Sequence, residues 1–167
     1  QCAQEYYFLI NGLRPDFRGG EPGVCQQGEG VTPERLNSLL HLIPNKVSLR
    51  RLWREHGACS GLGIDEYFVQ VDRASRLVAL PSAYLDGEHP DRVSASEFRQ
   101  QIVQLNPGLE VSAIRLSCKG AWLREVQVCL DPEFGFRACG ANVEESCRDE
   151  LRVREIPANR KARKPKS

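Results

Sequence analysis

The opening part of the chain changes from the apolar spacing of a strand to that of a helix. The aromatic and β-branched run Tyr6–Ile10 predicts a strand, and the many glycines within 18–30 predict a loop. Thr32 and Pro33 are residue types typical of a helix cap and of the first helical position. Apolar residues at helical spacing follow, and we expect this helix to end at Pro44.

Two more helices are predicted in the middle of the chain. The apolar face of the first has the spacing i, i+3, i+4 and i+7, through Leu49, Leu52, Trp53 and His56. His56 is therefore expected at the edge of an apolar stripe. The next helix is expected to begin at Asp65, which we take as its cap, and to end at Leu80.

The last third of the chain changes its apolar period from helical to alternating. The segment Ser94–Glu97 matches a capping box and begins a helix that we expect to end near Asn106. Alternation then predicts strands at Ile114–Cys118 and Arg124–Cys129, joined by a turn at Lys119–Gly120. This order of elements predicts an α+β fold.

Length and composition indicate one globular domain. The 167 residues suffice for a sizeable core; we expect one domain over 1–157 and a basic, disordered tail over 158–167. The net charge of +1 gives no global attraction for nucleic acid, so RNA binding needs a local basic patch. No apolar run is long enough for a membrane helix, and no signal peptide is recognisable. Because the chain begins at Gln1 without methionine, we expect a processed or truncated product.

Seven cysteines are many for this length. They favour a disulfide framework, and with it a secreted or extracytoplasmic protein of a periplasm, vacuole or lysosome-like compartment. A zinc site is disfavoured because no Cys-x-x-Cys pair occurs and the histidines lie far from paired cysteines. We therefore expect neither metal nor cofactor.

Two short motifs carry the candidate chemistry: INGLRPD at Ile10–Asp16 and LWREHGAC at Leu52–Cys59. In this order, separated by a glycine-rich loop with a cysteine, they resemble the two active-site blocks of the ribonuclease T2 family. The segment LREVQVC, which ends at Cys129, adds independent support. The resemblance covers most of the chain and implies a T2-like fold, with a twisted, mainly antiparallel sheet flanked by helices.

The same resemblance implies a set of disulfides, which would each stabilise the fold by roughly 2–4 kcal/mol. The implied pairs are Cys25–Cys59, Cys118–Cys147 and Cys129–Cys139. Cys2 is then left over. In the family, the matching cysteine pairs with an earlier N-terminal strand that this sequence does not contain. Either the chain lacks its front, or Cys2 is free or joins a second chain.

The implied reaction is RNA cleavage by transesterification. A base removes the proton of the 2′-hydroxyl, an acid protonates the leaving 5′-oxygen, and a 2′,3′-cyclic phosphate forms. Two imidazoles suit this reaction, because a pKa of about 6.5 lets one act as base and the other as acid.

Most of the implied catalytic positions are substituted in this chain. His56 matches one family histidine, whereas Asn11 stands in place of the other and cannot transfer a proton. Losing such a group costs about 10²–10⁴-fold in rate. The other substitutions are Leu52 for a carboxylate, Glu55 for a lysine, Arg51 for a phosphate-holding histidine and Arg14 for a tryptophan. With Trp53, Arg14 and Arg51 are the candidate ligand-binding residues.

Each of these residues also has a structural interpretation. His56 is either a retained acid or base, or a helix residue hydrogen-bonded at the core edge. Asn11 could fix the turn at Gly12, and Glu55 could form a surface ion pair with Arg51 or Arg54. The arginines could line a cleft or form a solvated charged face.

Two functions follow from different classes. The first is a binding or regulatory protein on a nuclease scaffold, with RNA, another anionic ligand or a protein as its partner. The second is a weak or rewired RNA endonuclease. A structural secreted protein remains a third interpretation. In all three interpretations we expect no membrane as a partner.

Overall fold

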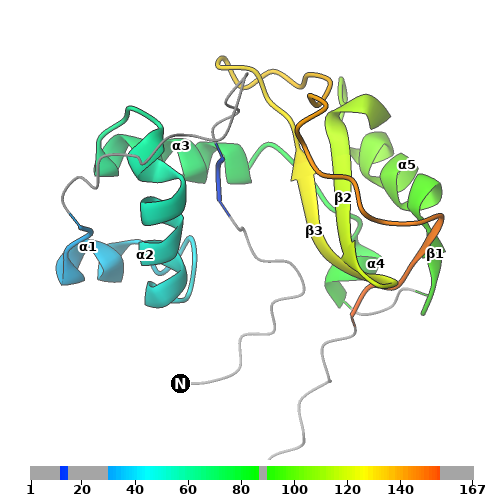
Figure 1. Cartoon of the computed structure of the whole chain (residues 1–167), viewed down its shortest axis with the longest axis horizontal. Coiled ribbons are helices and arrows are strands. Elements are labelled where there is room, and N and C mark those ends of the chain that lie inside the picture. Colours follow the sequence, from blue (N-terminus) through cyan, green and yellow to red (C-terminus); the bar gives the residue numbers. More distant parts are fainter. Residues whose placement is uncertain (1–11, 15–29, 87–89, 155–167) are drawn as a thin grey trace, which may run out of the picture. The chain divides into compact units, whose positions relative to one another are not determined.

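The computed structural model describes residues 12–14, 30–86 and 90–154. The described residues before Ala79 form one compact unit and those from Ala79 onward form another (Figure 1). We call them the helical unit and the sheet unit. The predicted strand at Tyr6–Ile10 and the predicted tail at 158–167 lie outside the described residues. The single domain over 1–157 stays a prediction.

Three α-helices and one short 3-10 helix make up the helical unit. They are α1 (Pro33–Ser38), α2 (Lys46–Glu55), η1 (Gly57–Cys59) and α3 (Ile64–Ser75). Polar side chains cap the first two: the Thr32 hydroxyl accepts a hydrogen bond from the Arg35 N–H, and the Asn45 carboxamide accepts two from the start of α2. The predicted cap at Thr32 is therefore confirmed.

The core of the helical unit is rich in large side chains. Leu36, Leu49 and Tyr67 are fully buried. The Tyr67 ring lies edge-on to its neighbours, with its centroid 5.8 Å from that of Trp53 and 5.3 Å from that of Phe68. Edge-to-face contacts of this kind are favourable beyond the area that they bury. The apolar stripes of α2 and α3 thus meet in one aromatic cluster.

Three predicted helix ends in this unit are wrong, one in α1 and two in α3. α1 ends at Ser38 and not at Pro44, because the chain turns there and the N–H groups of Leu42 and Ile43 both donate to the Leu39 carbonyl. These turn residues are buried all the same, so apolar spacing alone could not distinguish the turn from a helix.

The third predicted helix is displaced at both ends. α3 begins at Ile64 after Gly63 and not after Asp65, and it ends at Ser75 and not at Leu80. The early end has a tertiary cause. Ala79 exchanges two hydrogen bonds with the buried Asn106 side chain, at 2.7 and 2.8 Å, and these hold its backbone outside a helix.

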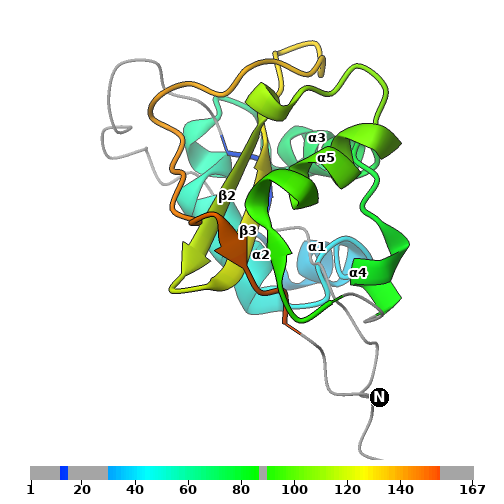
Figure 2. The same cartoon turned by 90° about the vertical axis from the view of Figure 1, so that its right-hand side faces the viewer.

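The sheet unit combines two antiparallel strand pairs with helices. Its elements are α4 (Ser82–Asp86), β1 (Val93–Ser94), α5 (Ala95–Leu105), η2 (Val111–Ala113), β2 (Ile114–Lys119), β3 (Trp122–Val128) and β4 (Glu150–Leu151). β2 pairs with β3 and β1 pairs with β4. Figure 2 shows α5 beside the β2–β3 hairpin, where its buried Phe98 and Ile102 supply part of the core.

The predicted elements of this unit are largely confirmed. The Ser94 hydroxyl accepts a hydrogen bond from the Glu97 N–H, as a helix cap should. The two predicted strands are β2 and β3, and the turn between them is at Gly120. α4 and the β1–β4 pair were not predicted. The class is thus a mixture of helices and antiparallel sheet, as expected.

Two disulfides fasten the segment after β3 to the hairpin. They join Cys118 to Cys147 and Cys129 to Cys139, the pairs that the resemblance implied. Hydrogen bonds reinforce the first, because the N–H groups of Ser146 and Cys147 both donate to the Leu116 carbonyl. Among the described residues, every helix is too short or too polar to span a lipid bilayer.

Candidate functional site

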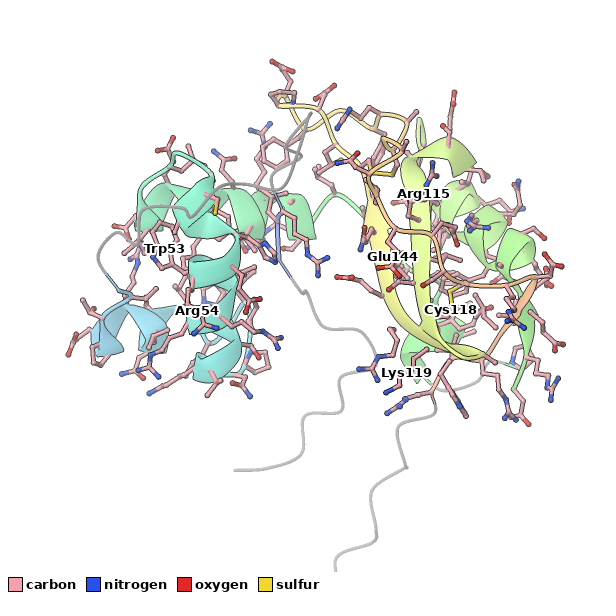
Figure 3. All side chains as sticks on the ribbon, viewed as in Figure 1. Trp53, Arg54, Arg115, Cys118, Lys119 and Glu144 are labelled. Carbon is pink, nitrogen blue, oxygen red and sulfur yellow. A yellow bond between two sulfur atoms is a disulfide. The ribbon has the colours of Figure 1, made fainter. Side chains whose placement is uncertain are left out.

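Helix α2 presents the second motif with one face buried and the other exposed. Leu49, Leu52 and Trp53 are 0, 3 and 7% exposed. Arg51 lies on the exposed face, and so does Arg54, which Figure 3 labels together with Trp53. The candidate ligand-binding residues of α2 therefore divide. Arg51 is available to a ligand, whereas Trp53 belongs to the core.

Glu55 forms a surface ion pair. Its carboxylate lies 3.2 Å from the Arg54 guanidinium, and both side chains are largely exposed. Pairs of this kind contribute about 0–1 kcal/mol to stability. The structure therefore supports the ion-pair interpretation of Glu55, with Arg54 as the partner.

His56 lies half-buried at the point where α2 passes into η1. Its N–H donates to the Leu52 carbonyl at 3.0 Å, and its own carbonyl accepts from the Cys59 N–H at 3.1 Å. The backbone of His56 is thus fixed on both sides. The side chain of His56 therefore starts from a fixed backbone position at the edge of the core, as the apolar stripe predicted.

Gly57 allows the chain to turn closely around the aromatic cluster. A Cβ atom at this buried position would overlap the Trp53 ring and come within 2.9 Å of the Tyr67 ring. Real Cβ atoms do not approach other atoms so closely, so only glycine fits without rearrangement. The residue that follows His56 is therefore needed for packing.

The first motif meets the second at Leu52. The backbone of Gly12 has a φ of +120°, and a Cβ atom there would overlap the Leu52 side chain. Gly12 thus lies directly on the apolar face of α2, one helical turn before His56. Leu52, which the resemblance aligns with a catalytic carboxylate, is here a core residue that contacts the backbone of the first motif.

Tyr67 holds the first motif in place from α3. Its hydroxyl donates a hydrogen bond of 2.6 Å to the carbonyl of Leu13. Burial raises the pKa of the Tyr67 phenol well above its ordinary value, and the positive charge of nearby Arg14 acts in the opposite direction. The phenol is therefore a neutral donor at any physiological pH. Its bond ties the loop to the aromatic cluster.

The described residues bring together part of the predicted site. Gly12, Leu52 and His56 come from the two motifs and meet on α2, while Arg14 and Arg51 are exposed on the same unit. Asn11 lies outside the described residues, so its position opposite His56 stays a prediction. The arrangement offers one imidazole for proton transfer and cationic side chains for an anion.

Tyr67 and Gly57 had no assigned role in the sequence analysis. Tyr67 was expected to be buried, but nothing in the sequence shows that its hydroxyl binds a carbonyl 54 residues away. Gly57 was part of the second motif, and its position directly after His56 was the only feature of the sequence that pointed to a role for it.

The cysteines and possible metal ligands of the chain are only partly within the described residues. No group of three or more potential metal ligands occurs among the described residues. The sulfur of Cys59 is in a disulfide, but Cys2 and Cys25 both lie outside the described part of the chain. The pairing of Cys25 with Cys59 therefore stays a prediction, and so does the state of Cys2.

The chain is similar to a ribonuclease. It is 26% identical over 165 residues to a protein named ribonuclease from Aeromonas hydrophila, and the alignment covers 95% of this chain and 71% of that protein. No family model matches the chain, and no solved structure matches it. The similarity extends over both units and therefore includes both motifs.

Proposed function

We propose that this chain is a ribonuclease T2-like protein that binds RNA and has lost efficient RNA cleavage, so that it acts as a binding or regulatory protein. The similarity to a ribonuclease supports the scaffold. The observation that carries the loss of cleavage is the burial of Leu52 beneath the backbone of Gly12. The T2 pattern needs a carboxylate at this position, and here hydrocarbon fills a packed space.

The remaining groups suit binding better than proton transfer. His56 is the one imidazole retained from the T2 pair, and Asn11 cannot replace the other. Glu55 places a carboxylate where the T2 pattern has a lysine to stabilise negative charge on phosphorus. Arg51 remains exposed as a cation, and guanidinium groups bind phosphate well.

Slow cleavage is the second candidate function. It is favoured by the name of the A. hydrophila relative and by His56, whose backbone is fixed between α2 and η1. In this case His56 works with Arg51, Glu55 or Asp16 in new roles, and the products carry 2′,3′-cyclic phosphates.

Cleavage of homopolymer RNA distinguishes the two. We expect poly-purine and poly-pyrimidine RNA at pH 5 and pH 7 to be cut at least about 100-fold more slowly than by an intact T2 enzyme, because one proton-transfer group is absent. Residual cleavage that disappears in His56→Ala would establish the second candidate. Cleavage as fast as that by an intact T2 enzyme would refute the loss of efficient cleavage.

A restored variant tests whether the site is otherwise intact. Asn11→His with Glu55→Lys should raise the cleavage rate, because it returns an imidazole and a cation to their T2 positions. Leu52 is left unchanged in this variant because it is buried. No gain in a folded variant would mean that more than these two side chains has changed.

RNA binding is tested with an oligonucleotide that carries 2′-O-methyl groups and so cannot be cleaved. Arg51→Ala should weaken binding, whereas Arg50→Ala is the matched control, because it removes the same charge from the neighbouring exposed residue. Equal effects of the two variants would count against a specific role for Arg51.

The two disulfides of the sheet unit support the proposed location. Disulfides persist in oxidising compartments and are rare in reducing ones. We therefore propose a secreted or otherwise extracytoplasmic protein. A second chain joined through Cys2 remains part of this proposal, and intact mass of the non-reduced protein would test it.

A further inference from the structure

A depression in the sheet unit combines aromatic and cationic side chains. Its volume is about 500 Å³, and it is lined by Asp91, Trp122, Arg152, Val153 and Arg154. All of these residues belong to the same compact unit. The lining thus offers one ring, two guanidinium groups and one carboxylate to a ligand.

Trp122 and Arg152 form a stacked platform in this depression. The central carbon of the Arg152 guanidinium lies 4.9 Å from the centre of the Trp122 ring. Trp122 is 38% exposed, which is unusual for so large an apolar side chain. Aromatic rings and guanidinium planes are the surfaces on which unpaired nucleobases stack.

The backbone fixes both members of the platform. The Arg152 N–H donates to the Ala121 carbonyl at 2.7 Å, and the Leu123 N–H donates to the Arg152 carbonyl at 2.9 Å. These bonds bracket Trp122 and form a parallel bridge between it and Arg152. Val153 is buried beside the platform. A platform held this way loses little conformational freedom when a ligand binds.

The charges around the platform favour an anion. Glu150 is paired with Arg92 at 2.7 Å, so its charge is largely compensated. Asp91 remains as one carboxylate against the guanidinium groups of Arg152 and Arg154. Lys119, labelled in Figure 3 at the hairpin turn, is the register partner of Trp122 and is exposed.

One donor at this site has no acceptor. The Nε atom of Arg152 is buried and has no hydrogen-bond partner in the described part of the chain. Buried donors are almost always paired in native proteins, so an exception calls for an explanation. Because this atom is shielded from solvent, it is not offered to a ligand in the depression, and the proposed phosphate contact of Arg152 uses the outer nitrogens of its guanidinium.

We propose that this depression is a subsite for one nucleotide of single-stranded RNA. The base stacks on the Trp122–Arg152 platform, its amino group donates to the Asp91 carboxylate, and the guanidinium groups of Arg152 and Arg154 hold the phosphate. The choice of RNA rests on the proposed function. The geometry of the platform does not depend on whether the protein cleaves its ligand.

The test measures binding of the whole chain to fluorescently labelled 2′-O-methyl hexaadenylate by anisotropy. Trp122→Ala should weaken binding about 5- to 100-fold, the effect of losing one base–aromatic stack. Trp122→Phe should retain most of the affinity, because a smaller aromatic ring still stacks. Unfolding curves of both variants verify that the fold is kept.

Salt dependence tests the phosphate contacts. Arg154→Ala should lower the slope of log affinity against log salt by about 0.7, the value for one phosphate contact on a single strand. Arg148→Ala is the matched control, because Arg148 is exposed in the same unit but does not line the depression. It should leave the affinity at the parent value.

The possible outcomes separate this subsite from the proposed function. If Trp122→Ala binds like the parent while Arg51→Ala binds weakly, the subsite is refuted and the proposed function stands. Equal losses in Arg148→Ala and Arg154→Ala would also refute the subsite, since they would indicate unspecific attraction. If the parent binds no oligonucleotide, both proposals fail.

Discussion

Gly57 determines how closely the chain can pass the aromatic cluster beside His56. We expect Gly57→Ala to destabilise the fold by about 1–3 kcal/mol, because the added methyl overpacks the contact with Trp53 and Tyr67. Urea unfolding measures the effect. Gly30→Ala is the control, since a Cβ atom at Gly30 meets no other atom within 4 Å. A loss in the free energy of unfolding no larger than that of the control would show that the aromatic side chains rearrange easily around the added methyl.

Tyr67 connects the two motifs, because its hydroxyl donates to the Leu13 carbonyl and its ring packs against Trp53. Tyr67→Phe should cost about 1–3 kcal/mol, because it leaves the Leu13 carbonyl without its buried partner. The expected loss is measured as the free energy of unfolding at neutral pH. An unchanged free energy would mean that water replaces the hydroxyl.

The same residue should make stability depend on pH in alkali. Burial raises the pKa of folded Tyr67, so the neutral phenol stabilises the fold fully below the ordinary pKa of about 10. This contribution is lost as the pH rises above that value. Stability should therefore fall progressively as the pH rises above about 10, and the fall should be smaller in Tyr67→Phe.

The sequence was enough to predict which residues belong to the site, but not which contacts they make. The stripe through Leu49, Leu52 and Trp53 was enough to place His56 at the core edge, because helical spacing is a local property. The bond from Tyr67 to Leu13 could not be predicted, since a phenol can donate to any carbonyl that the fold brings near. Contacts between distant residues need the tertiary structure.

At the scale of elements, α2 supports the first motif through Leu52. We expect Leu52→Glu to cost at least about 2–5 kcal/mol, the range for truncating a buried leucine, because Leu52 is 3% exposed and a carboxylate there would also lose its hydration. The loss should be smaller at low pH, where the new carboxyl is protonated. Leu52→Met is the volume-matched control and should cost less than about 1.5 kcal/mol.

Helices and strands with their own signals were predicted well. The cap at Ser94 and the alternation in β2 and β3 depend on neighbouring residues alone. The end of α3 was predicted too late in the chain, because the Asn106 side chain, which follows α5, forms hydrogen bonds with the N–H and the carbonyl of Ala79. Tertiary hydrogen bonds of this kind override local propensity.

The covalent framework acts on the whole molecule. Removing Cys118–Cys147 by a double serine substitution should cost about 1 kcal/mol more than removing Cys129–Cys139, because loops of 29 and 10 residues differ in closure entropy. Thermal or urea unfolding of the two variants gives the comparison. The reverse order would show that strain or local contacts outweigh loop length.

The class of the whole chain was predictable in outline. Composition and element order indicated a mixture of helix and antiparallel sheet, and the resemblance implied the two disulfides of the sheet unit. The division into two compact units could not be predicted. The boundary falls between Val78 and Ala79, and the sequence around it shows no change of composition that would indicate a linker.

The bond between Tyr67 and Leu13 also has a consequence for the order of folding. It spans 54 residues, whereas the turns within α2 and α3 join neighbours. Local turns form in about a microsecond, and closing a long loop first requires a surface on which to close. We therefore expect the first motif to dock after the helices have packed, so that the candidate site is among the last features of the helical unit to be assembled.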